Sequence, residues 1–303
     1  MTSDNSWESL FKPGEATDYF CFTDAPPILT GTEAFQLSNA WWLAEISRLI
    51  YHPDFYEKND ISFGEFQFGK VAYIKNKETS THVALLKVIQ ETPCLVIAFR
   101  GTDEIEDWSI NARAYQNSFN KGKVHRGFRK AYLSIQKELF AALEGNTLPI
   151  FITGHSLGAA LAVLATSELF NNSCFDSCYT FGSPRVGDPE FIKSFNTNSI
   201  YRIVNNSDIV TTVPIDFATI IYNHVGSAYL LDDKGELHEQ VNEDDVYAYQ
   251  KSRLQGLKDY ALSKFFNNEL NTIKDDLPSF LADHSPINYT FNIQQLLSHI
   301  DNN

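Results

Sequence analysis

The sequence has few basic residues and no long apolar run, and both shortages narrow what the protein can do. Its 24 lysines and arginines stand against 38 aspartates and glutamates, which gives a formal net charge of −14 over 303 residues. Nucleic-acid binding needs basic patches that neutralise phosphates, so this composition argues against nucleic acid as a partner. It also disfavours electrostatic docking on anionic lipid, though not hydrophobic docking on a neutral surface. A membrane-spanning helix needs about 18 or more consecutive apolar residues, and the sequence contains no such stretch.

Cysteine is scarce as well. The four cysteines are Cys21, Cys94, Cys174 and Cys178. No histidine or cysteine cluster with zinc-ligand spacing surrounds them, so we expect no metal ion. A disulfide framework is not expected in a chain of this length, and Cys94, at the start of the apolar run CLVIAF, is expected to be a buried free thiol.

The opening segment MTSDNSWESLFKPGEATDYF lacks the basic and apolar regions of a secretory signal. We therefore expect a cytoplasmic protein. A protein secreted without a leader would have the same kind of sequence. Hydrophobic residues make up 43% of the chain and aromatic residues 14%, which is enough for a sizeable core. No Gly/Ser-rich or Pro-rich linker divides the sequence. We predict one domain over residues 1–303, with a polar, turn-rich arm at residues 1–33.

Short apolar runs alternate with helical patterns through the middle of the chain. Four runs are typical of strands buried on both faces: residues 94–101, 148–154, 178–182 and 200–205. Helical patterns occupy residues 38–51, with Ser38 as the candidate N-cap, and residues 125–145, 157–170 and 188–195. The segments KVAYIKN and THVALLKVIQ predict a hairpin. This order predicts an α/β fold with a mainly parallel sheet and helices on both faces.

Residues 235–283 differ from the rest of the chain. They are acidic, largely helical in pattern and poor in strand signals. We interpret them as a helical insertion or cap within the single domain.

The segment GHSLG at residues 154–158 has the pattern G-x-S-x-G, with Ser156 at its centre. It follows a predicted strand and precedes a predicted helix, which is where a nucleophilic serine sits on a sharp, strained turn. The flanking glycines remove side chains that would collide at the turn. The helix N-terminus favours negative charge developing beside the serine. The pattern therefore favours a nucleophile over an ordinary turn serine.

A serine hydroxyl needs a base to remove its proton, and the base needs an orienting acid. This type of fold presents them in the order Ser, acid, His. Asp208 sits in a polar turn directly after a predicted strand, whereas Asp216 and Asp232 do not directly follow such a strand. Position alone leaves two candidates for the base, His284 in LADHSPINY and His224 in IIYNHVGSAYLL.

Several motifs together resemble the class 3 lipases, the fungal-type triacylglycerol lipase family. They are LVIAFRGTDEIEDW, VHRGFRKAY, ITGHSLGAALA, FGSPRVGD, NNSDIVTTVP, YNHVG and DHSPINY, in matching order over about residues 70–290. The resemblance implies an α/β-hydrolase fold and a triad of Ser156, Asp208 and His284, with His224 in a structural strand. It does not cover the N-terminal arm or the 235–283 insertion, and the interval from Asp208 to His284 is longer than in the compact fungal enzymes.

The resemblance also implies an oxyanion hole and a lid. The oxyanion donors would be Thr102 and the backbone N–H of Leu157. In the segment EIEDWSINARAY, four residues fall on one helical face and form the candidate lid stripe: Ile105, Trp108, Ala112 and Tyr115. A fixed surface helix packed on the core is the alternative for this segment.

We therefore predict a serine hydrolase that cleaves carboxylic esters of lipids through an acyl-enzyme, with no metal or organic cofactor. An esterase or phospholipase of the same fold is one alternative, because the pocket walls that select the acyl chain cannot be identified from one sequence. A non-catalytic scaffold that binds a partner is the other.

Overall fold

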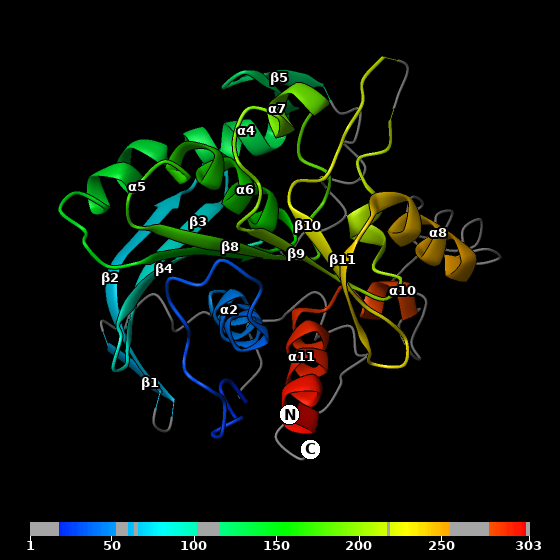
Figure 1. Ribbon diagram of the computed structural model, residues 1–303. Coiled ribbons are helices and arrows are strands. Elements are labelled where there is room, and N and C mark those ends of the chain that lie inside the picture. Colours follow the sequence, from blue (N-terminus) through cyan, green and yellow to red (C-terminus); the bar gives the residue numbers. More distant parts are fainter. Residues whose placement is uncertain are drawn as a thin grey trace.

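A nine-stranded sheet forms the centre of the protein. The computed structural model describes residues 18–52, 60–63, 66–101, 115–216, 219–254 and 279–300. The strand order across the sheet is β1-β2-β3-β4-β7-β8-β9-β10-β11 (Figure 1). The bounds are β1 (Asp60–Phe63), β2 (Phe66–Asn76), β3 (Thr81–Ile89), β4 (Cys94–Phe99), β7 (Ile150–His155), β8 (Phe175–Phe181), β9 (Ile200–Asn205), β10 (Ser227–Leu231) and β11 (Leu237–Val241). A separate antiparallel hairpin consists of β5 (Gln116–Phe119) and β6 (Gly122–His125).

The central strands β4, β7, β8, β9 and β10 run parallel to one another. The predicted parallel sheet is confirmed for this central part, and the predicted hairpin is the antiparallel pair β2–β3. The flanking strands are antiparallel, so the sheet is mixed as a whole. Every residue of β4 and β7 is buried, which explains why both sequences are continuous apolar runs.

Helices cover both faces of the sheet, as predicted (Figure 1). One face carries α2 (Leu37–Leu49) and α11 (Pro286–Ile300), and the other carries α4 (Arg126–Leu133), α5 (Gln136–Ala142), α6 (Leu157–Leu169) and α7 (Pro189–Ile192). The remaining helices are α8 (Glu243–Leu254), α10 (Ser279–Ala282) and the 3₁₀ turn η3 (Ile209–Thr212). A buried hydrophobic cluster fills the space on each face. Within the described ranges, no helix is long and apolar enough to cross a bilayer.

The described part of the N-terminal arm, residues 18–33, packs into the core. Glu45 and Arg48, one turn apart on α2, are fully buried and pair at 2.8 Å. Arg48 also contacts Asp18 at 2.7 Å, and the Phe20 N–H donates to Glu45 at 3.2 Å. A buried charge is tolerated when it is paired and hydrogen-bonded, so these contacts attach the arm to α2.

Two predicted helix boundaries are wrong. The helix expected to start with Ser38 as its N-cap begins at Leu37, after Gln36, whose side chain makes no capping bond. The helical pattern at residues 125–145 forms two helices, α4 and α5, with His125 as the N-cap of the first. The apolar periodicity continues across the break, so the pattern alone did not reveal it.

The expectation that residues 235–283 are helical is wrong at their start. β11 lies there and pairs with β10 at the edge of the sheet. Its three middle residues are exposed and polar, so it lacks the alternating apolar pattern that identifies a strand. α8 follows, as the helical pattern predicted, and residues 255–278 lie outside the described part of the chain.

Most of the candidate lid also lies outside the described residues. Four candidate site residues fall in the undescribed range 102–114: Thr102, Ile105, Trp108 and Ala112. Tyr115 is described, and it precedes β5 without being helical, so the expectation that it shares a helical face is wrong. Its side chain is 63% exposed, and its carbonyl accepts a hydrogen bond from the Arg126 N–H.

Candidate active site

Ser156 lies at the sharp turn between β7 and α6. Its backbone has φ +59° and ψ −127°, a conformation that residues with a side chain rarely adopt. The Ser156 N–H donates to the carbonyl of Phe181 at the end of β8, at 3.0 Å. The strained residue is therefore fixed by the neighbouring strand.

Two glycines allow this turn to form. A Cβ at Gly154 would lie 2.4 Å from the carbonyl carbon and oxygen of Gly158. A Cβ at Gly158 would lie 2.1 Å from the carbonyl oxygen of Phe99, at the end of β4. Any side chain at either position would therefore push the start of α6 away from the sheet. The G-x-S-x-G spacing is in this way a steric requirement of the turn.

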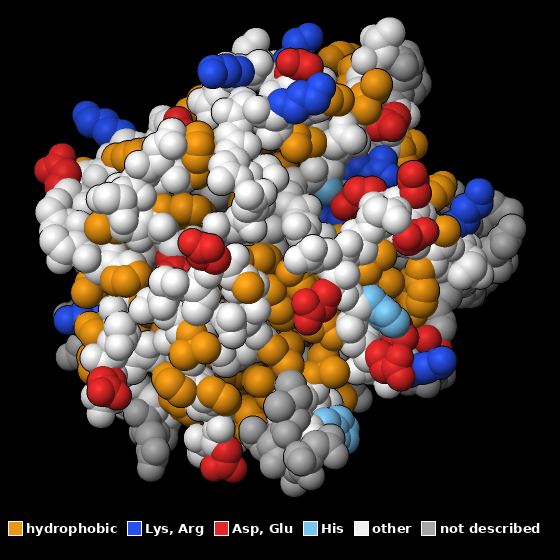
Figure 2. Space-filling view, in the orientation of Figure 1, with side chains coloured by type: hydrophobic (Ala, Val, Ile, Leu, Met, Phe, Trp, Pro, Cys, Tyr) orange, Lys and Arg blue, Asp and Glu red, His pale blue; other side chains and the backbone are white. Residues whose placement is uncertain are grey.

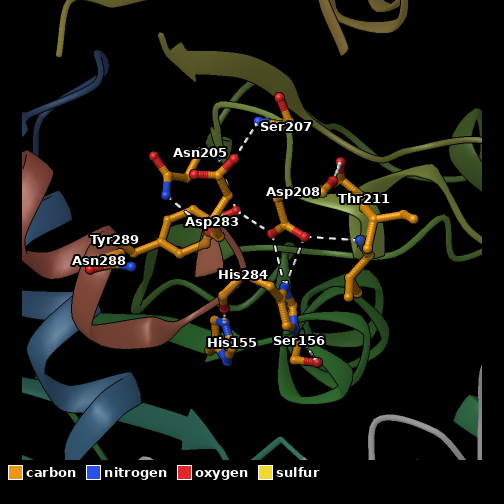
Figure 3. A network of polar contacts seen from close by, with 12 residues as sticks. His155, Ser156, Asn205, Ser207, Asp208, Thr211, Asp283, His284, Asn288 and Tyr289 are labelled. Atoms are coloured by element: carbon orange, nitrogen blue, oxygen red, sulfur yellow. Dashed lines mark hydrogen bonds and ion pairs between the residues drawn. The ribbon is translucent and has the colours of Figure 1, made fainter. Parts of the chain in front are cut away.

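His284 joins Ser156 to Asp208 (Figure 3). Its Nε2 lies 2.9 Å from Ser156 Oγ, and its Nδ1 lies 2.8 Å from Asp208 Oδ2. Asp208 directly follows the turn after β9, and His284 lies between α10 and α11. The structure thus brings together the three residues that the sequence singled out from three separate segments. Their side chains form one hydrogen-bonded chain of the kind that activates a serine.

Asp208 is completely buried, and several donors compensate its charge. The Val210 N–H donates to Oδ1 at 2.9 Å, and the Tyr289 hydroxyl donates to Oδ2 at 2.6 Å. Burial, and then the negative charge of Asp208, raise the pKa of Tyr289 well above its usual value, so the phenol stays a donor. Sequence reasoning missed Tyr289, although it is the last residue of the motif DHSPINY.

The loops that carry the acid and the base are also bonded to each other. The Ser207 N–H donates to Asp283 Oδ2 at 3.0 Å, and the Asn205 side-chain amide donates to the Asp283 carbonyl at 2.9 Å. Ser207 directly precedes Asp208, and Asp283 directly precedes His284 (Figure 3). The distance between acid and base is therefore set by the backbone as well as by their own bond.

His155 supports His284 from the other side. Its Nε2 lies 2.7 Å from the His284 carbonyl, and its Nδ1 lies 3.2 Å from the Tyr51 hydroxyl. Burial, and then the neighbouring His284, lower the pKa of His155 well below its usual value. A neutral His155 donates from Nε2 to that carbonyl and accepts at Nδ1 from Tyr51. Both ring nitrogens are thus occupied, and neither is directed at Ser156.

His224, the other candidate for the base, contacts a different part of the site. Its Nε2 donates to the Thr211 carbonyl at 2.8 Å. Burial, and then the positive charge of Arg202, lower the pKa of His224 well below its usual value. His224 lies just before β10 rather than within a strand. It therefore supports the turn after Asp208 and leaves the contact with Ser156 to His284.

The structure describes one of the two predicted oxyanion donors, Leu157. Leu157 is the first residue of α6, so its N–H is one of the donors that have no partner within the helix. Thr102 is outside the described residues, but its neighbour Gly101 is described. A Cβ at Gly101 would lie 2.8 Å from the His155 carbonyl, so the backbone at Gly101 lies against the turn that carries Ser156.

The serine is closed off from solvent. Ser156 is 1% exposed, and Asp208 and His284 are 0% exposed. An ester carbonyl cannot reach Ser156 Oγ in this conformation. Any reaction at the serine requires part of the surface to move first.

Among the described residues, side chains of the types that bind metals gather at the hairpin between β10 and β11. Ligand atoms of Asp232, Glu236 and His238 lie within 4.8 Å of one another there. Asp232 accepts hydrogen bonds from the Glu236 N–H and from His238 Nε2, both at 2.9 Å, so formation of the turn explains why the three side chains lie close together.

All four cysteines are free, and Cys94 is buried as predicted.

Part of the chain is similar to known lipases. Residues 96–218 match the family model described as Lipase (class 3). The middle of the chain is therefore similar to the class 3 lipases. The lipase of Rhizomucor miehei is 32% identical over 167 residues, which is 50% of this chain and 46% of that protein. Phospholipase A1-II 1 of Oryza sativa subsp. indica is 30% identical over 172 residues, covering 46% and 43%. The chain spans less than half the length of both relatives.

Solved structures show the same fold. The crystal structure of mono- and diacylglycerol lipase from Aspergillus oryzae superposes with a TM-score of 0.62. It shares 20% sequence identity and covers 83% of this chain and 95% of that chain. The fold is therefore the α/β-hydrolase fold that the family resemblance implied.

Proposed function

We propose that this protein is a serine hydrolase that cleaves carboxylic esters of lipids. The observation that supports it most directly is the hydrogen-bonded chain from Ser156 through His284 to Asp208, with contacts of 2.9 and 2.8 Å. The similarity to class 3 lipases supports the substrate class, because the two relatives are named as a lipase and a phospholipase A1.

In the proposed reaction, Ser156 Oγ attacks the ester carbonyl while His284 Nε2 takes its proton. Asp208 holds the imidazole in the tautomer with hydrogen on Nδ1 and stabilises the charged imidazolium. The N–H of Leu157 and a donor from Thr102 stabilise the tetrahedral oxyanion. His284 then protonates the departing alcohol, and in the second half-reaction it activates the water that releases the fatty acid. In each half-reaction His284 takes up one proton and releases it again. The proposed reaction therefore needs no cofactor.

The lid proposal follows from the closed serine and from the apolar stripe of the candidate lid. We propose that the segment carrying Ile105 and Trp108 moves when the protein meets a lipid surface. Turning these two side chains into water would cost about 3–6 kcal/mol, so opening would be rare in water and favoured on lipid. Specific activity should then rise when a short-chain ester passes from monomers to aggregates. Equal activity on both forms would contradict the proposal.

Labelling with a fluorophosphonate tests the proposed nucleophile. We expect the wild-type protein to be labelled at Ser156, and the Ser156→Ala variant to lose labelling and about 10⁶-fold in kcat. Retention of more than a tenth of the activity would exclude Ser156 as the nucleophile. Absence of labelling in the wild-type protein would instead favour a non-catalytic scaffold.

A substrate panel then separates the ester classes. Relatives with about equal identity are named lipase and phospholipase A1, so the lipid head group needs its own experiment. Short p-nitrophenyl esters, a long-chain triacylglycerol and phosphatidylcholine should be compared by kcat/KM. We expect the triacylglycerol to exceed the short ester. Preference for the short ester would indicate an esterase, and preference for phosphatidylcholine a phospholipase.

A further inference from the structure

Helix α8 lies beyond the segment that matches the family model and packs against the loop that carries Asp208. Val246 on its inner face is buried with residues of β9 and β10, namely Val204, Ala228 and Leu230. Acidic side chains gather on the right of the face shown in Figure 2, over α8 and the β10–β11 hairpin. The first turn of the helix is thus acidic and exposed, and Val246 fixes the inner side of the helix to the sheet.

Gln250 lies one turn after Val246 and is 3% exposed. Its Nε2 lies 2.8 Å from Thr211 Oγ1 and 3.2 Å from the Asp208 carbonyl oxygen. The Thr211 hydroxyl in turn donates to the same Asp208 carbonyl at 2.8 Å. Both hydrogens of the Gln250 amide are therefore directed at the short turn that holds the acid.

Neighbouring residues of α8 attach to the same region. The Tyr249 hydroxyl donates to Asn206 Oδ1 at 2.8 Å, and Asn206 has a left-handed backbone with φ +46°. The Glu243 carboxylate, at the start of the helix, pairs with the buried Arg202 on β9. α8 therefore contacts the strand before the acid and the residues on both sides of it.

We infer that Gln250 is a positioning residue for Asp208, an inference that rests on the proposed function. Its amide fixes the backbone at Asp208, and that backbone determines where the carboxylate meets His284 Nδ1. Misplacing a catalytic group by about 1 Å can cost about 10²-fold in rate, so a donor outside the triad can act through geometry alone. By this inference α8 belongs to the catalytic machinery of this chain, although the family match does not include it.

The variant Gln250→Met tests the inference, because it keeps the length of the side chain and removes both N–H donors. The matched control is Gln136→Met, which removes an amide on α5 that donates to Glu168 on α6 at 2.7 Å, away from the triad. Active sites are counted by fluorophosphonate titration, and kcat and KM are measured with a short p-nitrophenyl ester. We expect Gln250→Met to lower kcat per titrated site about tenfold and to leave KM within about twofold. Gln136→Met should keep the wild-type kcat per titrated site even if it lowers the melting temperature.

A purely structural role for Gln250 would reduce the number of titrated sites or the melting temperature and leave kcat per site unchanged. That result would overturn the inference. If Gln250→Met does not fold, Tyr249→Phe serves the same purpose, with an expected loss of about threefold in kcat per site, and an unchanged kcat would again overturn the inference. A wild-type protein that neither reacts with the fluorophosphonate nor hydrolyses the ester would overturn the proposed function, and this inference with it.

Discussion

Tyr289 donates a hydrogen bond to Asp208, with its hydroxyl oxygen 2.6 Å from Oδ2. The same hydroxyl accepts from the Asn205 N–H at 3.1 Å. Tyr289 lies on α11, the helix that follows His284. One short segment therefore supplies the base and also anchors the acid, which ties the geometry of both to the packing of α11.

Removing this hydroxyl should weaken both activity and stability. We expect Tyr289→Phe to lower kcat about 3–30-fold, because Asp208 loses a charge-assisted hydrogen bond. Unfolding free energy should fall by about 1–3 kcal/mol, because the buried Asn205 N–H loses its acceptor. Tyr201→Phe is the matched control, since the buried Tyr201 hydroxyl has no hydrogen-bond partner among the described residues. Equal effects of the two variants on kcat per titrated site would contradict the prediction.

Replacing His284 and His224 in parallel separates the base from its rival. His284→Ala should lower kcat about 10⁶-fold, as removal of a base that acts together with its nucleophile does. His224→Ala should keep kcat per titrated site within about tenfold of wild type. It should still lose stability, because the Thr211 carbonyl loses its donor. A larger loss of kcat for His224→Ala than for His284→Ala would reverse the assignment.

Much of this site could be predicted from the sequence, because the chemistry constrains short motifs. The strained turn needs glycines at fixed positions, and the acid must follow a strand, so Ser156 and Asp208 could be identified from local sequence. The base was harder to identify, because the segment carrying His284 is distant in sequence and position alone also admitted His224. The family resemblance selected His284, and the structure shows its imidazole in contact with Ser156.

Other features depend on side chains from distant segments and leave no local signal. The Tyr289 hydroxyl contacts Asp208 only because α11 packs beside the turn after β9. The Gln250 amide has an unremarkable sequence context, and its contact with Thr211 arises from the packing of α8. β11 was missed for a related reason, because an exposed edge strand has no buried face to produce an apolar pattern.

Gly182 should be essential for a steric reason. It has φ +59°, and a Cβ there would lie 2.8 Å from Asp208 Oδ2 and 2.9 Å from His284 Nδ1. We expect Gly182→Ala to displace the acid–base pair and lower kcat per titrated site about 10²-fold. Gly145→Ala is the control, because Gly145 has a similar φ of +76° with nothing within 4 Å of its Cβ position. Both variants incur the backbone cost of about 1–2 kcal/mol, so a similar kcat in both would contradict the prediction.

Stability should decrease in mildly acidic solution, in part because of His125. Burial lowers the pKa of His125 from 6.5 to about 4, while its Nδ1 accepts from the Phe128 N–H at the start of α4. Between these two pH values the unfolded chain binds a proton that the folded protein does not, so the folded state loses stability as the pH falls. At pH 5 this effect of His125 makes the free energy of unfolding about 2 kcal/mol lower than at neutral pH.

The variant His125→Asn isolates this contribution, because asparagine still provides an acceptor at the N-cap and does not titrate. Unfolding free energies of both proteins should be measured by urea denaturation at about pH 7.5 and about pH 5. We expect the wild-type protein to lose about 2 kcal/mol more than the variant over this interval. His155 and His224 remain in both proteins and also have lowered pKa values, so the variant should keep some acid sensitivity. An identical loss in the two proteins would show that His125 takes up its proton equally readily in the folded and unfolded states.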